Sequence, residues 1–314
     1  MNAAAELPLV HARGLIKRFD DLVAVDGIDF DVQKGEAFGF LGPNGAGKSS
    51  TMRMIGCVSP PSGGTLRVLG LDPVKNGADI RAQLGVVPQE DTLDLELTVR
   101  ENMLIYGRYF GLGRKVVHER AERLLEFVQL EERLDSKVEP LSGGMKRRLT
   151  IARSLINEPD ILLLDEPTTG LDPQARHVVW DRLHELKHRG ATLLLTTHYM
   201  DEAEQLCDRL VVMDKGKIAA EGSPVELIRR YSTREVVELR FAAERPPDDL
   251  AARIDGLARR VETLSGRLLL YTDDGDRTAE RVHELGVQAQ STLVRRSTLE
   301  DVFLHLTGRT LVDE

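Results

Sequence analysis

This 314-residue chain has few cysteines, few aromatic residues and no excess of basic charge. Its two cysteines, Cys57 and Cys207, have neither metal-ligand nor redox spacing, so we interpret both as inert thiols of a reducing compartment. Acidic residues number 51 against 42 basic ones, and the net charge of −9 argues against a nucleic-acid-binding protein, which would need a basic field. We therefore expect no nucleic acid among its partners.

Long apolar stretches are also lacking. No run approaches the roughly 18 residues of a membrane-spanning helix. Met1–Pro8 lacks the charged start and apolar run of a signal peptide, so we expect none. If the chain serves transport, we expect the membrane path to belong to another polypeptide. Its length suffices for a sizeable core and a smaller second module.

The strongest pattern in the chain is Gly-x-x-x-x-Gly-Lys-Ser at positions 42–49. An apolar stretch before it predicts a buried strand at Ala37–Leu41, and residues 50–55 predict a helix after it. This order lets backbone N–H groups bind phosphate at the positive end of a helix. Lys48 is expected to reach the β- and γ-phosphates, and Ser49 to bind Mg²⁺. The predicted nucleotide contacts here are Gly42, Pro43, Asn44, Gly45, Ala46, Gly47, Lys48, Ser49 and Ser50.

A second apolar stretch, Ile161–Leu164, predicts a central parallel strand and is followed by two acids, Asp165 and Glu166. Ligands bind at the carboxyl ends of such strands, so Asp165 is placed to hold Mg²⁺ through water. Glu166 is placed to polarise the water that attacks the γ-phosphate. An acidic turn after a strand is the alternative, and the phosphate-binding pattern in the same chain favours the catalytic interpretation.

A third pattern, Leu141–Met145, opens a helical segment expected over 146–155. The Ser142 hydroxyl and the amides of Gly143 and Gly144 would stand at the helix N-terminus and form a second anion site. Two phosphate-binding helix ends in one chain imply a shared ligand.

With these three motifs the chain resembles the nucleotide-binding subunits of ABC transporters, from about Leu9 to Tyr231. The signature of that family is LSGGQ, and Met145 replaces its Gln here. Two copies of such subunits face head to tail with two ATP between them, so the resemblance implies a homodimer. Further matches, in the family's order, are Phe19, Gln89, Asp172 and His198.

The resemblance implies a role for each of these residues. Phe19, where the family more often has Tyr, would stack on adenine. Gln89 would bind Mg²⁺ or the attacking water, and His198 would donate to the γ-phosphate and keep Glu166 and the water in line. Asp172, in the D-loop, joins the expected ATP contacts.

The order of expected elements predicts an α/β fold with a parallel core sheet. A small antiparallel sheet is expected before Gln33 and a helical subdomain at about 90–158, all within a nucleotide-binding domain at 1–231. Residues 232–314 predict a small α+β C-terminal domain of βαββαβ order, with a first helix at 248–259. Predicted helix starts are the capping boxes Thr98/Glu101, Ser223/Glu226 and Ser297/Glu300.

Segments near 94–102, 107–111 and 143–150 also resemble the nodulation-factor and daunorubicin-resistance subfamily of ABC exporter ATPases. That resemblance implies an ATPase using ATP and Mg²⁺, docked on a separate membrane permease at the cytoplasmic face of the inner membrane. The cargo would be an amphiphile, namely a lipo-oligosaccharide, an antibiotic or a polysaccharide. The alternative is a soluble ABC ATPase acting on nucleic acid or ribosomes. The C-terminal domain fits either a packing module or a regulatory ligand site.

Overall fold

The chain divides into two compact units, Met1–Gly222 and Ser223–Glu314. The computed structural model describes residues 7–242, 250–254 and 256–308. The helix α8 (Pro224–Tyr231), which we expected at the end of the first domain, belongs to the second unit. It packs there beside the last helix, with the rings of Tyr231 and His305 6.4 Å apart.

A six-stranded sheet forms the core of the first unit. Its order is β5-β6-β7-β3-β8-β9, and its first five strands run parallel. The last strand pairs antiparallel and closes one edge. The predicted parallel core is therefore confirmed. In chain order the strands are β3 (Ala37–Leu41), β5 (Leu84–Val87), β6 (Ile161–Asp165), β7 (Thr192–Thr197), β8 (Arg209–Asp214) and β9 (Lys217–Gly222).

The predicted N-terminal antiparallel sheet is present and has three strands in the order β2-β1-β4. They are β1 (Val10–Phe19), β2 (Leu22–Val32) and β4 (Gly63–Val68). The helix α1 (Lys48–Ile55) contacts strands of both sheets, and apolar side chains from both sheets meet in one buried cluster. This packing holds the start of α1 at the carboxyl end of β3.

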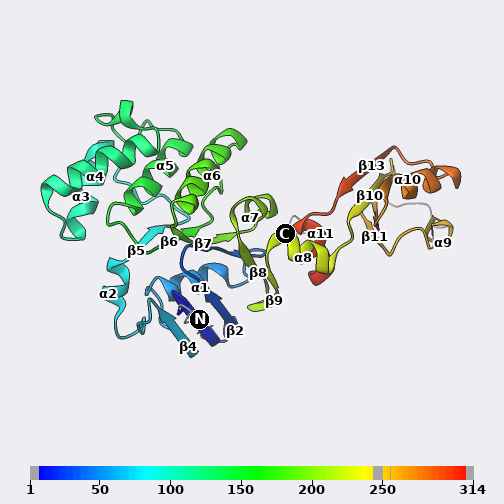
Figure 1. Cartoon of the computed structure of the whole chain (residues 1–314), viewed down its shortest axis with the longest axis horizontal. Helices are drawn as coiled ribbons and strands as arrows, with labels where there is room; N and C mark the ends of the chain where they lie inside the picture. The colour runs from blue at the N-terminus through cyan, green and yellow to red at the C-terminus, as the bar shows by residue number, and fades with distance from the viewer. Residues whose placement is uncertain (1–6, 243–249, 255, 309–314) are drawn as a thin grey trace, which may run out of the picture. The chain divides into compact units, whose positions relative to one another are not determined.

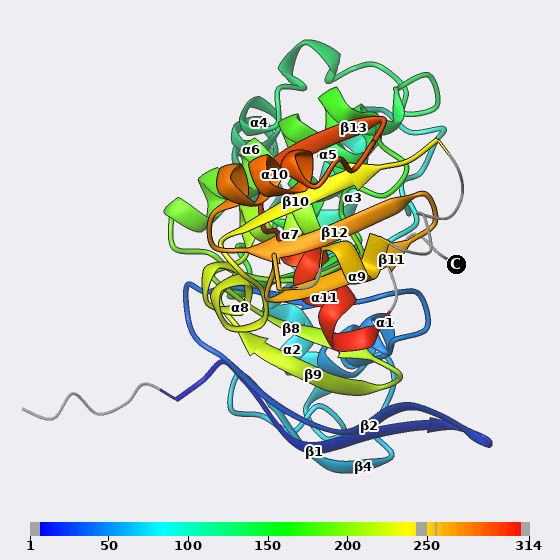
Figure 2. The ribbon, with the colours of Figure 1, turned by 90° about the vertical axis from the view of Figure 1, so that its right-hand side faces the viewer.

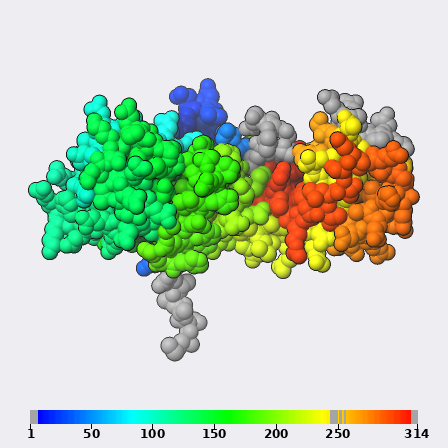
Figure 3. Space-filling model, turned by 90° about the horizontal axis from the view of Figure 1, so that it is seen from above, coloured from blue at the N-terminus to red at the C-terminus, as the bar shows by residue number. Residues whose placement is uncertain are grey.

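The helical subdomain has its own apolar core, which includes Val99, Leu125 and Leu149. Figure 1 shows this subdomain and the N-terminal sheet at opposite sides of the core sheet. The space-filling view shows the subdomain as one contiguous mass of cyan and green (Figure 3). Its helices are α3 (Val99–Tyr109), α4 (Arg114–Phe127), the short 3-10 turn η1 (Glu131–Arg133) and α5 (Gly143–Ser154). The unit's remaining helices are α2 (Gly77–Ala82), α6 (Pro173–His188) and α7 (Met200–Leu206).

The second unit contains a four-stranded antiparallel sheet of order β11-β12-β10-β13. The four strands lie side by side in Figure 2. Its strands are β10 (Glu235–Arg240), β11 (Arg260–Leu264), β12 (Arg267–Thr272) and β13 (Ser291–Arg296). Its helices after α8 are α9 (Leu250–Arg253), α10 (Gly275–Glu284) and α11 (Leu299–Thr307). This is the βαββαβ order predicted for the C-terminal domain.

The helix α9 is shorter than the predicted 248–259. It ends at Arg253, and Gly256 takes a φ of +74°, a left-handed conformation that an α-helix does not continue through. The predicted start, Asp248, lies outside the described residues. Among the helices that the structure describes, none is both long and apolar enough to cross a membrane.

Candidate nucleotide site

The loop between β3 and α1 is shaped by its glycines. Gly47 has a φ of +102°, and a Cβ atom there would lie 2.4 Å from the Ala24 carbonyl oxygen. A Cβ atom at Gly42 would lie 2.3 Å from the carbonyl oxygen of Met213. Only glycine fits at these two positions, because the neighbouring main chain approaches too closely for a side chain. The loop therefore presents its backbone N–H groups at the start of α1.

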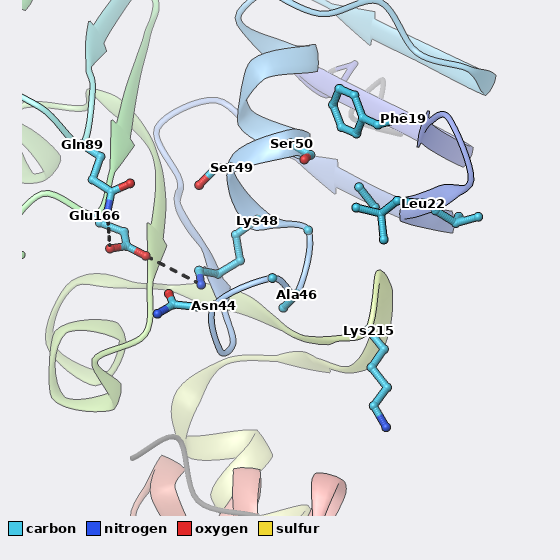
Figure 4. Close-up of a pocket in the computed structure, with 14 residues that line it drawn as sticks. Phe19, Leu22, Asn44, Ala46, Lys48, Ser49, Ser50, Gln89, Glu166 and Lys215 are labelled. Carbon is cyan, nitrogen blue, oxygen red and sulfur yellow. Dashed lines mark hydrogen bonds and ion pairs between the residues drawn. The ribbon is translucent and has the colours of Figure 1, made fainter. Parts of the chain in front are cut away.

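A cavity of about 510 Å³ lies against this loop, within the usual range of roughly 300–1,000 Å³ for small-molecule sites. The half-exposed ring of Phe19 stands at one end, and Gln89 and Glu166 stand at the other (Figure 4). The predicted residues that line the cavity are Phe19, Asn44, Gly45, Ala46, Gly47, Lys48, Ser49, Ser50, Gln89 and Glu166. The lining residues that the sequence did not predict are Leu22, Val23, Ala24 and Lys215.

The Lys48 side chain is buried beneath the loop that it follows. Its Nζ donates to the carbonyl oxygens of Gly42 (2.8 Å) and Pro43 (2.9 Å). The same nitrogen lies 3.8 Å from Oε1 of Glu166. The cation is thus held between the glycine-rich loop and Glu166, as Figure 4 shows.

Asp165 closes β6 and contacts the first turn of α1. The Ser49 hydroxyl donates to its Oδ1 at 3.1 Å, and the Thr196 hydroxyl donates to the same oxygen at 2.5 Å. The two strand ends and α1 therefore bring a hydroxyl and a carboxylate together. These are hard oxygen donors, the type that Mg²⁺ prefers.

Glu166 is the point on which the predicted catalytic residues converge. Its side chain is buried, with His198 Nδ1 3.3 Å from Oε1 and Gln89 Nε2 donating to Oε2 at 3.2 Å. The Thr169 hydroxyl also donates to Oε2, at 3.1 Å. Contact with His198 lowers the pKa of Glu166 below its ordinary value. Burial acts in the opposite direction, and the charge of Lys48 adds to the lowering. The carboxylate is therefore ionised at neutral pH.

Backbone geometry also singles out Glu166. It is a non-glycine residue with a φ of +46°, a left-handed conformation that costs energy for an L-residue. Its N–H lies 3.1 Å from the carbonyl oxygen of Thr196 and 3.0 Å from that residue's hydroxyl oxygen, both of which accept from it. Thr196 thus contacts both acids, a role that the sequence did not reveal. Its only signal was its position shortly before His198.

The remaining predicted ATP contacts do not line this cavity. Gly42 and Pro43 belong to the same loop and accept from Lys48, and the other four lie at the starts of two helices. Ser142 is the N-cap of α5 and accepts from the N–H of Met145 at 3.3 Å, while Asp172 is the N-cap of α6. A Cβ atom at Gly144 would lie 2.8 Å from Cβ of Ala175, so the starts of α5 and α6 are packed together. Ser142, Gly143, Gly144 and Asp172 are therefore grouped with one another and not with Lys48.

A glycine-rich phosphate loop after β3, a histidine after the neighbouring parallel strand β7 and a carboxylate pair at the end of β6, the next strand, define a nucleoside triphosphatase of the ABC type. Residues 25–169 match the ABC transporter family, and residues 248–308 match the C-terminal domain of the nodulation factor export protein NodI. The chain belongs to the ABC transporter family of ATP-binding subunits, and it is an ATPase.

Two curated relatives resemble the chain over nearly its whole length. It is 47% identical to the Nod factor export ATP-binding protein I of Burkholderia lata, covering 96% of this chain and 97% of the relative. It is 49% identical to the protein of the same name from a Rhizobium species, covering 95% and 96%. Among solved structures, a dimeric ATP-binding cassette bound to ADP and phosphate matches with a TM-score of 0.62 and 26% identity. That match covers 68% of this chain and 98% of the cassette.

Proposed function

We propose that the cavity binds Mg²⁺·ATP and that Glu166 activates the hydrolytic water. The observation that carries this proposal is the convergence of Lys48, Gln89 and His198 on one buried, ionised carboxylate beside a phosphate loop. The adenine stacks on Phe19, and Lys48 binds the β- and γ-phosphates. Glu166 accepts a proton from the attacking water, while His198 and Gln89 orient that carboxylate and the γ-phosphate.

Ser49 and Asp165 fit a magnesium ion, because the ion is commonly bound through one or two protein oxygens together with substrate phosphates. The contact of 3.1 Å between the Ser49 hydroxyl and the Asp165 carboxylate supports this assignment. Bound there, Mg²⁺ would neutralise charge on the β- and γ-phosphates. Gln89, the third predicted ligand, has its side-chain oxygen on the side of Ser49 in Figure 4.

We further infer that two copies form a head-to-tail dimer, with Ser142 and Gly144 of one chain at the nucleotide of the other. Two observations support this: the signature residues lie outside their own chain's cavity, and the similar cassette bound to ADP and phosphate is a dimer. Gly143→Asp tests the arrangement. A Cβ atom there would meet only Leu171 Cδ2, at 3.9 Å, so its own chain has room.

The Gly143→Asp variant is expected to lose ATP hydrolysis because its carboxylate repels the partner's γ-phosphate. Nucleotide binding by the monomer should persist, since Lys48 is untouched. Gly143→Asn, of equal size without the charge, is the matched control and should retain more activity. An equal loss of ATP binding by the isolated Gly143→Asp monomer would contradict the dimer.

The function that the site and the relatives support best is that of the ATPase subunit of an exporter. ATP-driven closure of the dimer would move a separate permease at the cytoplasmic face of the inner membrane. Residues 90–96 and the exposed face of α3, which carries Ile105 and Tyr109, would dock the permease's cytoplasmic helices. The relatives' names as Nod factor export proteins favour a lipo-oligosaccharide as cargo, with an antibiotic or a polysaccharide next.

ATPase activity of the complex reconstituted with the permease tests this function. Activity should rise with lipo-oligosaccharides or with amphiphilic drugs, and should be unaffected by small polar nutrients. Stimulation only by a nutrient delivered through an external binding protein would overturn the exporter assignment. Failure to associate with membranes when co-expressed with the permease would favour a soluble ATPase acting on nucleic acid or ribosomes.

A further inference from the structure

Helix α5 carries a buried arginine, Arg147, for which the sequence predicted no role. Its guanidinium reaches away from the helical subdomain toward the end of β6, and only 4% of the residue is exposed. All of its hydrogen bonds within the described chain are donated to main-chain carbonyls. Nε donates to the carbonyl oxygen of Pro167 (2.6 Å). Nη1 donates to those of Pro88 (2.5 Å) and Gln89 (3.5 Å), and Nη2 to those of Asp165 (3.1 Å) and Glu166 (3.0 Å).

These carbonyls surround the strained position at Glu166. The guanidinium binds the carbonyl before it, its own carbonyl and the one after it. Thr196 accepts from the N–H of Glu166 through both the hydroxyl and the carbonyl oxygen. A left-handed φ at a non-glycine residue persists only where the surroundings hold it. Arg147 and Thr196 together supply that hold.

The same guanidinium also binds the main chain at Gln89, whose side chain contacts Glu166. Gln89 donates its side-chain amide to Oε2 of Glu166, and Arg147 binds the carbonyls of Pro88 and Gln89 behind it. One rigid, planar group with several donors therefore sets the distance between these two side chains. Arg147 belongs to the helix that begins at Gly143 and has Ser142 as its N-cap.

We propose that Arg147 is a positioning residue that holds Glu166 and Gln89 in hydrolytic geometry and links them to the signature helix α5. This inference rests on the proposed role of Glu166 as the group that activates water. Without the guanidinium, the main chain at Glu166 relaxes and its carboxylate moves. A misplacement of about 1 Å costs on the order of 100-fold in rate.

Arg148, the next residue of α5, provides a matched control. Its guanidinium also binds main-chain carbonyls, those of Val128 (2.7 Å) and Gln129 (3.3 Å), and both lie within the helical subdomain. Replacing it removes a similar group from the same helix without touching the end of β6. A loss that came only from weakening α5 would appear in both variants.

The experiment measures single-turnover ATP hydrolysis and ATP affinity for the full-length variants Arg147→Ala, Arg147→Lys and Arg148→Ala. Arg147→Ala should lose about 100-fold in rate with ATP affinity nearly unchanged. Arg147→Lys should recover part of that rate, because an ammonium group donates to fewer of the carbonyls at once. If Arg147→Ala fails to fold, the comparison between Arg147→Lys and Arg148→Ala carries the test, with the former expected to be slower.

A double-mutant cycle with Glu166→Gln separates positioning from simple stability. If Arg147 acts through Glu166, Arg147→Ala should cost far less in the Glu166→Gln background than in the wild type. Equal losses in both backgrounds, or a loss no larger than that of Arg148→Ala, would overturn the proposal. Near-normal hydrolysis by Glu166→Gln alone would instead refute the proposed role of Glu166, so the two failures are distinguishable.

Discussion

Both units of this chain bury a carboxylate, and the two differ in what surrounds it. Glu166 of the first unit lines a cavity of about 510 Å³. Asp301 of the second unit is 1% exposed and is enclosed by its own neighbours. Arg295 donates to it twice, at 2.8 and 2.9 Å, the Thr298 N–H donates at 2.8 Å, and the Tyr271 hydroxyl donates at 3.2 Å.

This difference separates the charge that we propose to be catalytic from a structural one. Burying a carboxylate is unfavourable unless partners replace its water. Around Asp301 the partners come from β12, β13 and the residue before α11, and they enclose the carboxylate on all the sides that these bonds occupy, so no ligand is needed. Around Glu166 the partners come from distant segments and one side of the cluster faces the cavity. We expect neutralisation of the two carboxylates to have opposite consequences.

The largest effect is expected for Glu166→Gln. The amide keeps the shape of the side chain but cannot accept a proton from water, and a positioned base contributes roughly 100- to 10,000-fold. Turnover should fall by that factor, while ATP affinity stays near normal and an ATP-bound dimer accumulates. Size-exclusion chromatography with ATP and a phosphate-release assay measure both outcomes. Turnover within a few-fold of the wild type would remove Glu166 from this role.

The converse change, Asp301→Asn, should reduce stability and spare the nucleotide site. It removes the carboxylate to which Arg295 donates twice and leaves that guanidinium the longer contact with Glu238, at 3.7 Å. Breaking a buried pair costs about 3 kcal/mol where one partner is partly exposed, as Arg295 is. Faster hydrogen exchange in β10 and β13 should report the loss. The single tryptophan, Trp180, lies in the first unit, so its fluorescence change on unfolding should be little affected.

Glu300→Gln is the control for that experiment, because Glu300 is the exposed neighbour of Asp301 in the first turn of α11. It should change hydrogen exchange little. ATP binding that fails in Asp301→Asn but not in Glu300→Gln would show that the enclosed network serves the nucleotide site after all.

The sequence predicted those features that depend on local chemistry. The phosphate loop and the strand before the two acids were expected from residue type and order, and the fold is confirmed. The capping box of Thr98 and Glu101 is present, with the Thr98 N–H donating to Glu101 at 2.8 Å. The last helix differs by one residue: Thr298 is its N-cap, because Asp301 and not Glu300 turns back toward the chain.

What the sequence could not reveal depends on contacts between distant segments. Thr196 and Arg147 reach Glu166 from 30 and 19 positions away, and the motifs in which they lie do not predict these contacts. The shortened α9 is a different case: the left-handed φ of Gly256, shortly after its end, is a local conformation that the order of residues did not predict. The placement of α8 in the second unit depended on its packing partner, which no capping signal identifies.

The smallest predicted effect concerns a second buried carboxylate of the first unit, Glu202. It tests whether the surroundings of a buried carboxylate, rather than the unit in which it lies, decide how it changes stability with pH. Thr168 donates to it at 2.7 Å and Trp180 at 3.1 Å, and burial raises its pKa. His198 lowers the pKa of Glu166 instead.

A lowered folded-state pKa gives stability that is present above the unfolded value of about 4.3 and is lost as pH falls. A raised one gives stability that is present below that value and is lost as pH rises. We compare the unfolding free energy of the wild type with that of each variant. For Glu166→Gln, the wild-type value minus the variant value should grow as pH rises near 4. For Glu202→Gln the difference should shrink as pH rises above 4. Denaturant unfolding between pH 3 and 7 measures both, and the same sign for the two variants would refute the contrast.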